Sequence, residues 1–370
     1  MTIGRKITPL RRDDIPELSQ FLISGFGEPA TSSYFSHDVL AWKYFDGPTS
    51  FPVPQRADSP CSLIARSAGK IVAHLGICFR QFVISGDGTS ENAATPISTM
   101  HAIDWLGSAV HPGSGSLLML EAFKTCKTQF AVGGSAQSQA LFPRLGFEPK
   151  GTVASFRRVL SPLHRLQTTD QRLFRRWAGA TKDAAAVWRA CLRGCVRPSP
   201  QTVELRPVTE FTADIDGLVR KSSLRLVRCQ RNHQLLNYLL RYPRSGFSGF
   251  TIHAPRHAPR HASGRMIGFA LLKVTPHGRI QFGKIVDCWL DTDDASCWQA
   301  AIAALIDQLR AQSADDVKCY ATHPSLHAAL LANGFSKSGE SKVCIRDTHH
   351  LLPRDLPFAL SGFEADGAIV

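Results

Sequence analysis

The most informative pattern of apolar and polar positions lies between residues 101 and 147. Residues 101–110 are rich in apolar side chains and predict a strand, and a turn of small residues follows at 112–116. The apolar positions in 117–123 cluster as on one face of a helix, and 130–132 predict a second, short strand. Residues 140–145 predict a short helix, because the glycine after them is common at helix ends. The segment thus reads strand, turn, helix, strand, short helix.

The turn before the predicted helix has the composition of an anion site. Backbone N–H groups at the start of a helix have no intrahelical acceptor, and the helix dipole favours negative charge there. Gly113 and Gly115 allow a ligand to approach the backbone closely. A pyrophosphate group is the expected guest, although the turn lacks the lysine of a phosphate-binding NTPase loop.

The chain before this segment predicts elements that can complete a sheet. A short strand at 7–10 precedes a helix, which Asp13 or Asp14 can cap and whose first turn suits Pro16. Residues 62–83 predict a hairpin with its turn at 68–70.

A repeat relates the two halves of the chain. The same separation of 195 residues joins three pairs of landmarks, which are Leu10 and Leu205, Pro48 and Pro243, and Gly69 and Gly264. The sequence at 103–106 also resembles that at 286–290, and Gly146-Phe147 resembles Gly334-Phe335.

The repeat predicts two homologous α/β halves. Their expected limits are 1–160 and 201–348, with a basic helical linker at 161–200 and a C-terminal tail at 349–370. In the second half, Asp293 and Asp294 occupy the turn before the corresponding helix, and either can cap it. Because carboxylates repel phosphates, we expect this half not to bind the same ligand.

Composition limits the class of protein. With 370 residues, 44% of them hydrophobic, the chain is long enough for two globular domains. No apolar run approaches the roughly 20 residues that span a bilayer, and the N-terminus has no apolar signal core, so a cytoplasmic protein is expected. The net charge of +13 suits an anionic partner, such as the lipid surface on the inner side of the membrane or an anionic polymer. No nucleic-acid-binding motif is present, so specific nucleic-acid binding is not expected.

The cysteines and histidines do not predict a metal site. The ten cysteines are scattered and have no zinc-like spacing of two ligand pairs. His253, His257 and His261 recur in a proline- and arginine-rich run that predicts a flexible loop.

The central segment resembles the GNAT acyltransferase superfamily. The resemblance rests on Val110-His111-Pro112 at the strand end, Gly113-Ser114-Gly115 entering the helix, and the closing Gly146-Phe147. It implies two GNAT-like domains in tandem, each a mixed, mainly antiparallel sheet flanked by helices, with acetyl-CoA or another acyl-CoA as co-substrate. It further implies that the CoA contacts Gly107, Ser108, Ala109, Val110, Gly113, Ser114, Gly115, Ser116, Ser135 and Gln137.

The residues for proton transfer are less clear from the sequence. Phe142 stands where the family often has a tyrosine acid, and a phenyl ring cannot donate a proton. The candidate bases are Asp104 and His101 on the predicted strand and His111 at its end. Because side chains alternate along a strand, we expect Asp104 and His101 not to enter one cleft together.

Three functions remain open on the sequence. The first is an N-acyltransferase, and a narrower resemblance to tandem-GNAT proteins of bacterial envelope and exopolysaccharide assembly implies an amine acceptor on a sugar or envelope precursor. That resemblance rests on WKYFDGP, IDWLGS, VGGSAQSQALFPRLGF and FRRVLSP. The second is an inactive GNAT-fold binding or scaffold protein, and the third a Fem-like aminoacyl transferase.

Overall fold

The computed structural model covers most of both predicted halves. It describes residues 6–47, 61–85, 96–161, 203–218, 225–244, 246–254 and 264–364, together with Thr181 and Ala184. The predicted linker at 161–200 therefore lies almost wholly outside the described residues. Pro48 and the histidine-containing loop at 255–263 also lie outside them.

The first half contains the elements that the sequence predicts, with shifted ends. In order they are β1 (Lys6–Pro9), η1 (Arg12–Asp14), α1 (Ile15–Phe26), η2 (Ser33–Phe35), α2 (His37–Tyr44), β2 (Ser62–Ser67), β3 (Lys70–Ser85), β4 (Ile97–Gly107), α3 (Ser114–Ala122), β5 (Thr128–Val132), α4 (Ala136–Leu141), η3 (Pro143–Leu145) and β6 (Glu148–Val159). The strand predicted at 101–110 begins earlier and ends at Gly107, and α3 begins within the small-residue turn. The hairpin turn is confirmed, with Ala68 and Gly69 both at positive φ.

The second half follows the same order with two added strands. Its elements are β7 (Glu204–Val208), α6 (Asp214–Leu218), β8 (Leu226–Cys229), α7 (His233–Leu240), β9 (Phe247–His253), β10 (Met266–His277), β11 (Ile280–Leu290), α8 (Ala295–Ala311), β12 (Asp316–Ala321), α9 (Pro324–Ala332), β13 (Ser336–Asp347) and β14 (Phe358–Ala359). Asp294 caps α8, as predicted, by accepting a hydrogen bond from the Ser296 amide. Among these described helices, none is long and apolar enough to cross a lipid bilayer.

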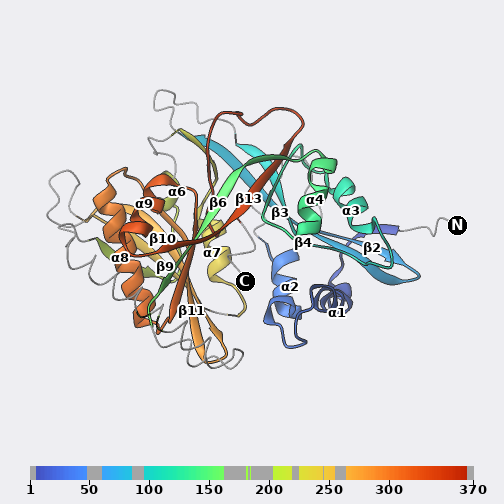
Figure 1. Cartoon of the computed structure of the whole chain (residues 1–370), viewed down its shortest axis with the longest axis horizontal. Helices are drawn as coiled ribbons and strands as arrows, with labels where there is room; N and C mark the ends of the chain where they lie inside the picture. Colours follow the sequence, from blue (N-terminus) through green and yellow to red (C-terminus); the bar gives the residue numbers. More distant parts are fainter. Residues whose placement is uncertain are drawn as a thin grey trace.

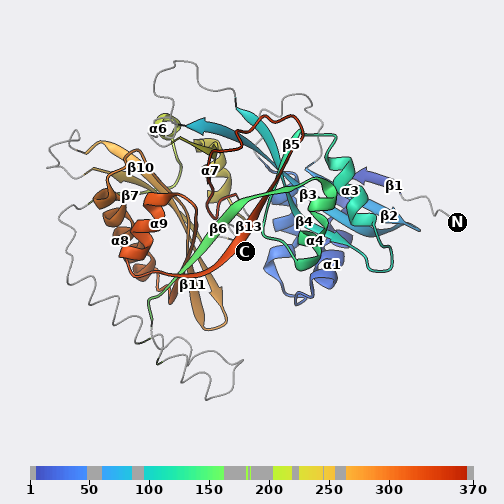
Figure 2. The ribbon, with the colours of Figure 1, turned by 45° about the horizontal axis from the view of Figure 1, so that its top comes forward.

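The two halves share one mixed, mainly antiparallel sheet, which confirms the predicted fold class. Its main path runs β1-β2-β3-β4-β5-β13-β6-β12-β11-β10-β9-β7. The last strand of each half thus joins the other half: β13 pairs with β5, and β6 pairs with β12. Figures 1 and 2 show these two long strands crossing side by side at the centre of the molecule.

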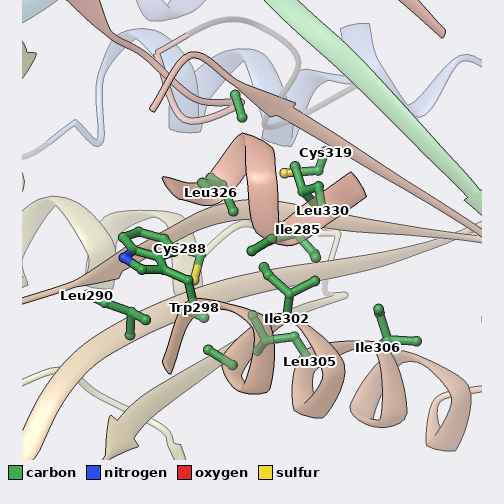
Figure 3. Close-up of a cluster of buried hydrophobic side chains, with 14 of the residues drawn as sticks. Ile285, Cys288, Leu290, Trp298, Ile302, Leu305, Ile306, Cys319, Leu326 and Leu330 are labelled. Atoms are coloured by element: carbon green, nitrogen blue, oxygen red, sulfur yellow. The ribbon is translucent and has the colours of Figure 1, made fainter. Parts of the chain in front are cut away.

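Helices cover both faces of the sheet. In the first half, Leu118 and Met119 of α3 pack on one face, and Leu18 of α1 and Leu40 of α2 on the other. In the second half, α8 and α9 build a core around Trp298 (Figure 3). The α7 helix packs on the opposite face, where Tyr238 stacks on Trp42 of α2 with ring centroids 4.1 Å apart.

The predicted C-terminal tail is packed against the sheet as far as the structure describes it. Leu352, Leu360 and Phe363 are buried in the core that α7 covers. Glu364 is also buried and forms an ion pair with Arg231 at 2.6 Å, which anchors this end of the described chain.

Candidate active site

Two parallel strands diverge in the first half and leave a wedge between them. The pairing of β4 with β5 extends from Thr99 with Thr128 only as far as His101 with Phe130. β5 pairs with β13 over its whole length on the opposite edge, and past His101 none of the described strands pairs with the side of β4 that faces β5. A cavity of about 550 Å³ lies where the strands separate.

Both halves of the chain line this cavity. The first half contributes residues from β4, from the end of β5 and α4, and from α1 and η2, among them His101, Asp104, Trp105, Tyr34, Ser135 and Phe142. The second half contributes Tyr320 from β12, Ser341 from β13 and Ser361 from the tail. The exchange of β6 and β13, together with the docked tail, brings these last three residues to the wedge.

A β-bulge places Asp104 on the same side of β4 as His101, so the predicted separation of the two residues is wrong. The register between β3 and β4 shifts at this point, and Asp104 has a φ of +47°. A bulge interrupts the alternation of side chains. Ile103 and Asp104 consequently both point towards α1 and α2, whereas Trp105 points towards α3.

The Asp104 carboxylate is buried and accepts hydrogen bonds from three side chains. Lys43 Nζ lies 2.9 Å from one oxygen and the Tyr44 hydroxyl 2.5 Å, and the Tyr34 hydroxyl lies 3.2 Å from the other. Burial alone would raise the pKa of Asp104, but the Lys43 ammonium and the Tyr44 hydroxyl outweigh it and hold the pKa below its usual value. A carboxylate held so firmly in its ionised form is a weak general base. Its geometry fits a role in positioning the bulge.

His101 is buried beside Asp104 and stacks on Phe130, with ring centroids 4.7 Å apart. Burial lowers the pKa of His101 to about 3. Burial also lowers the pKa of the nearby His74, to about 4. Because a carbonyl oxygen only accepts, the Nδ1 of His74 donates the 2.9 Å hydrogen bond to the Asp104 backbone carbonyl. Both imidazoles are therefore neutral at neutral pH and gain little from accepting a proton.

Because of these two buried histidines, we expect the protein to lose stability in mild acid. Their folded pKa values lie below the unfolded value of about 6.5, so the unfolded chain binds more protons as the pH falls from about 6.5 towards 4. Each histidine then lowers the free energy of unfolding by up to about 1.4 kcal/mol per pH unit. In urea titrations, His101→Phe is expected to flatten this slope while leaving stability at pH 7.5 close to that of the wild type. An unchanged slope would contradict the assignment.

The predicted anion turn forms the N-terminus of α3 and connects with the cavity through Trp105. Gly113 is the exposed N-cap residue with a φ of +80°, and the amides of Gly115 and Ser116 lie in the first helical turn. The indole of Trp105, which lines the cavity, donates to the Gly115 carbonyl at 2.9 Å. The Ser114 hydroxyl is buried and donates to the His111 carbonyl at 2.8 Å.

The structure separates the remaining predicted residues into two groups. Ser135 lines the cavity and caps α4 by accepting from the Ser138 amide, so its backbone and side chain are fixed at the wedge. The cavity wall does not include His111 or Gln137. Likewise outside the wall are Ser108, Ala109 and Val110, which follow the end of β4 on the way to the turn.

The place that corresponds to the wedge in the second half is filled by side chains. Trp298 of α8 is fully buried among Cys288, Leu290 and Leu326, as Figure 3 shows. His323 at the start of α9 stacks on the Trp298 ring, with centroids 5.0 Å apart. The starts of α8 and α9 are thus bridged by packed aromatic rings.

Known structures show the same fold at low sequence identity. A GCN5-related N-acetyltransferase from Anabaena variabilis aligns over 93% of this chain and 73% of its own, with 11% identity and a TM-score of 0.55. A putative acetyltransferase from Pyrococcus horikoshii aligns over 98% and 96%, with 10% identity and a TM-score of 0.53. Saccharomyces cerevisiae N-myristoyltransferase with bound myristoyl-CoA aligns over 94% and 79%, with 10% identity and a TM-score of 0.57.

Sequence comparisons add no closer relative. No protein-family model matches the sequence, and a search of curated proteins found no match. The likeness is therefore one of fold, and the fold is that of the GNAT N-acyltransferases, with matches that extend over both halves of the chain.

Proposed function

We propose that this protein is an acyl-CoA-dependent N-acyltransferase. The observation that carries the proposal is the wedge between β4 and β5, joined by Trp105 to the N-terminus of α3. A helix N-terminus favours the phosphates of CoA, and a strand edge without a neighbour offers hydrogen bonds to an extended, amide-containing arm.

The residues of the chain fit this ligand in order along its length. The first-turn amides of α3, at Gly115 and Ser116, would hold the pyrophosphate, and Gly113 leaves open space beside them. The β5-facing backbone groups of β4 after His101 would bind the pantetheine arm. When bound, acyl-CoA supplies an activated thioester, and we propose acetyl as the acyl group.

Transfer requires that the acceptor nitrogen reach the thioester carbonyl in the cavity. The C–N bond forms as the C–S bond breaks, the thiolate takes up a proton, and the amine loses one. Positioning of the two reactants supplies much of the rate in such a reaction. The Asp104 carboxylate holds Lys43, Tyr44 and Tyr34 in place, which fixes the cavity wall against α2 and η2.

We propose that another phenol in the cavity takes the role that Phe142 cannot fill. Tyr34 and Tyr320 both line the wall, one from each half of the chain. A phenol is a suitable donor to a leaving thiolate. We propose an amino sugar or envelope precursor as the acceptor, and contact with an anionic membrane surface or polymer through the excess of basic residues.

Calorimetric titration with acetyl-CoA tests the proposal directly. We expect one site per chain with a dissociation constant in the micromolar range, and a rise in melting temperature that increases with ligand concentration. Desulfo-CoA, which keeps the pyrophosphate and pantetheine arm, should bind comparably. Absence of binding at millimolar acetyl-CoA would contradict the proposal and favour a binding protein on a GNAT frame.

A further inference from the structure

The cavity at the wedge has two ends, one on each face of the sheet. On the face that α3 covers, its wall includes Trp105 and Phe142, whose ring centroids lie 6.3 Å apart. On the other face, its wall includes Phe26 and Glu28 at the end of α1, and Phe35 of η2. We call this second part the α1 end of the cavity. Because the proposed phosphate site lies at the N-terminus of α3, the α1 end is the one that remains for an acceptor.

The cavity wall is acidic, although the chain as a whole has a net charge of +13. Among the described residues, the wall includes the carboxylates of Glu28 and Asp104 but no lysine or arginine. The Lys43 ammonium lies 2.9 Å from Asp104 and balances its charge. The Glu28 side chain has no ion pair or hydrogen bond within the part of the chain that the structure describes. One negative charge at the cavity is therefore left for a ligand.

The end of α1 fixes the backbone of Glu28. Gly27 has a φ of +69°, and its amide donates to the carbonyls of Ile23 and Ser24. The Glu28 amide donates to the Ile23 carbonyl at 3.0 Å, which completes a Schellman motif. The Glu28 side chain is exposed to solvent, but it extends from a backbone that is held at the cavity wall.

Phe26 provides an apolar surface two residues before Glu28. Its ring stacks on Phe35, with centroids 5.4 Å apart and planes 9° from parallel, yet the residue is still 44% exposed. The neighbouring rings of Tyr34 and Phe35 already face the Lys43 ammonium, which lies 3.4 and 5.5 Å from their centres. An aromatic face attracts cations and packs against flat apolar groups. Together, the carboxylate and the exposed ring favour a cation that is attached to a ring.

We propose that the α1 end binds the acyl acceptor as an ammonium ion paired with Glu28, with a ring of the acceptor packed on Phe26. This inference rests on the proposed function and specifies the substrate class of the same site, which is a cationic amine beside a ring, with no acid group of its own. The bound ammonium would release a proton to solvent at this open end before its nitrogen attacks the thioester.

Three probes with the same phenyl ring test the charge preference without any need for turnover. Phenethylamine, 2-phenylethanol and phenylacetate carry a positive, a neutral and a negative group, and ligand-observed NMR titrations give their dissociation constants. We expect phenethylamine to bind about tenfold more tightly than 2-phenylethanol, and phenylacetate to bind most weakly. Glu28→Gln should abolish the difference between the first two. Phe26→Ala should weaken both to the same extent.

The matched control is Glu148→Gln, at an exposed glutamate of β6 that lines a different pocket. This variant should keep the wild-type preference for phenethylamine. Three outcomes would overturn the proposal: equal affinity of the wild type for phenethylamine and 2-phenylethanol, an unchanged preference in Glu28→Gln, or no binding of any of the three probes.

Glucosamine and glucose then distinguish a sugar ring from an aromatic one. Displacement of phenethylamine by glucosamine but not by glucose would identify an amino sugar, and displacement by neither would leave an aryl amine as the acceptor. Equal displacement by both sugars would count against recognition of the ammonium group.

Acetyl-CoA binding is measured separately and is expected to survive Glu28→Gln, because Glu28 lies at the end of the cavity away from α3. Absence of acetyl-CoA binding in the wild type would reject the proposed function, while the probe titrations would still decide the role of Glu28.

Discussion

Replacing Ser116 with aspartate is expected to weaken acetyl-CoA binding by about a hundredfold or more, because like charges brought together cost several kcal/mol. Ser116 lies half-buried in the first turn of α3, beside the amides that would hold the pyrophosphate. An acidic residue in the first turn of a helix is itself stabilising, by about 0.3–1 kcal/mol. The variant should therefore stay folded and lose the ligand through charge repulsion. Calorimetric titration measures the loss.

The structure supplies a matched control for this variant. Ser325 lies partly covered in the first turn of α9, so Ser325→Asp makes the same substitution at a different helix N-terminus. We expect acetyl-CoA to bind this control as it binds the wild type. Gly115 is a poorer target, because a Cβ there would lie 3.0 Å from the Trp105 indole nitrogen and would disturb the packing itself. If Ser116→Asp and Ser325→Asp bind acetyl-CoA equally, the turn is not the pyrophosphate site.

The sequence predicted many of the helices and strands because their signals are local. The small-residue turn, the hairpin turn at Gly69 and the cap at Asp294 each depend on a few neighbouring residues. The exchange of β6 and β13 has no such signal. Val343 of β13 pairs with Val132 of β5, although more than half of the chain separates them in the sequence. The alternation of apolar residues along β13 would be the same if this strand paired with any other strand.

The candidate site could be predicted only in part for the same reason. The sequence predicted Asp104 as a candidate base from its place on the strand, and the structure places a bulge there and at the corresponding segment 286–290. The side to which Asp104 points depends on its φ of +47°, a conformation that aspartate tolerates but does not require. Tyr320, Ser341 and Ser361 could not be predicted, because the strand exchange and the docked tail bring them to the cavity.

Asp104→Asn is expected to lower the free energy of unfolding by about 3–5 kcal/mol at pH 7, since it leaves the buried Lys43 ammonium without its counterion. The amide keeps the shape of the carboxylate and tolerates the positive φ, so the loss reports on charge. Adding Lys43→Met should restore much of the stability, because the unpaired charge is then removed. Urea denaturation measures all three proteins. An Asp104→Asn protein as stable as the wild type would show that Asp104 does not hold the bulge.

The pH dependence of this difference has a definite sign. The folded pKa of Asp104 lies below its unfolded value, so its contribution is complete above the unfolded pKa and is lost as the pH falls through the folded pKa. The gap between wild type and Asp104→Asn should therefore be constant near neutrality and close only in strong acid.

The corresponding bulge of the second half provides the comparison. Asp287 pairs there with the buried Arg231 at 2.5 Å, but Arg231 also has Glu364 at 2.6 Å. Asp287→Asn leaves the guanidinium with one carboxylate, so it should cost less stability than Asp104→Asn. The two substitutions also separate structure from function, because only Asp104 borders the cavity at the wedge. If Asp104 positions that wall, the folded fraction of the Asp104→Asn protein should bind acetyl-CoA more weakly than the wild type. Asp287→Asn should leave acetyl-CoA binding unchanged.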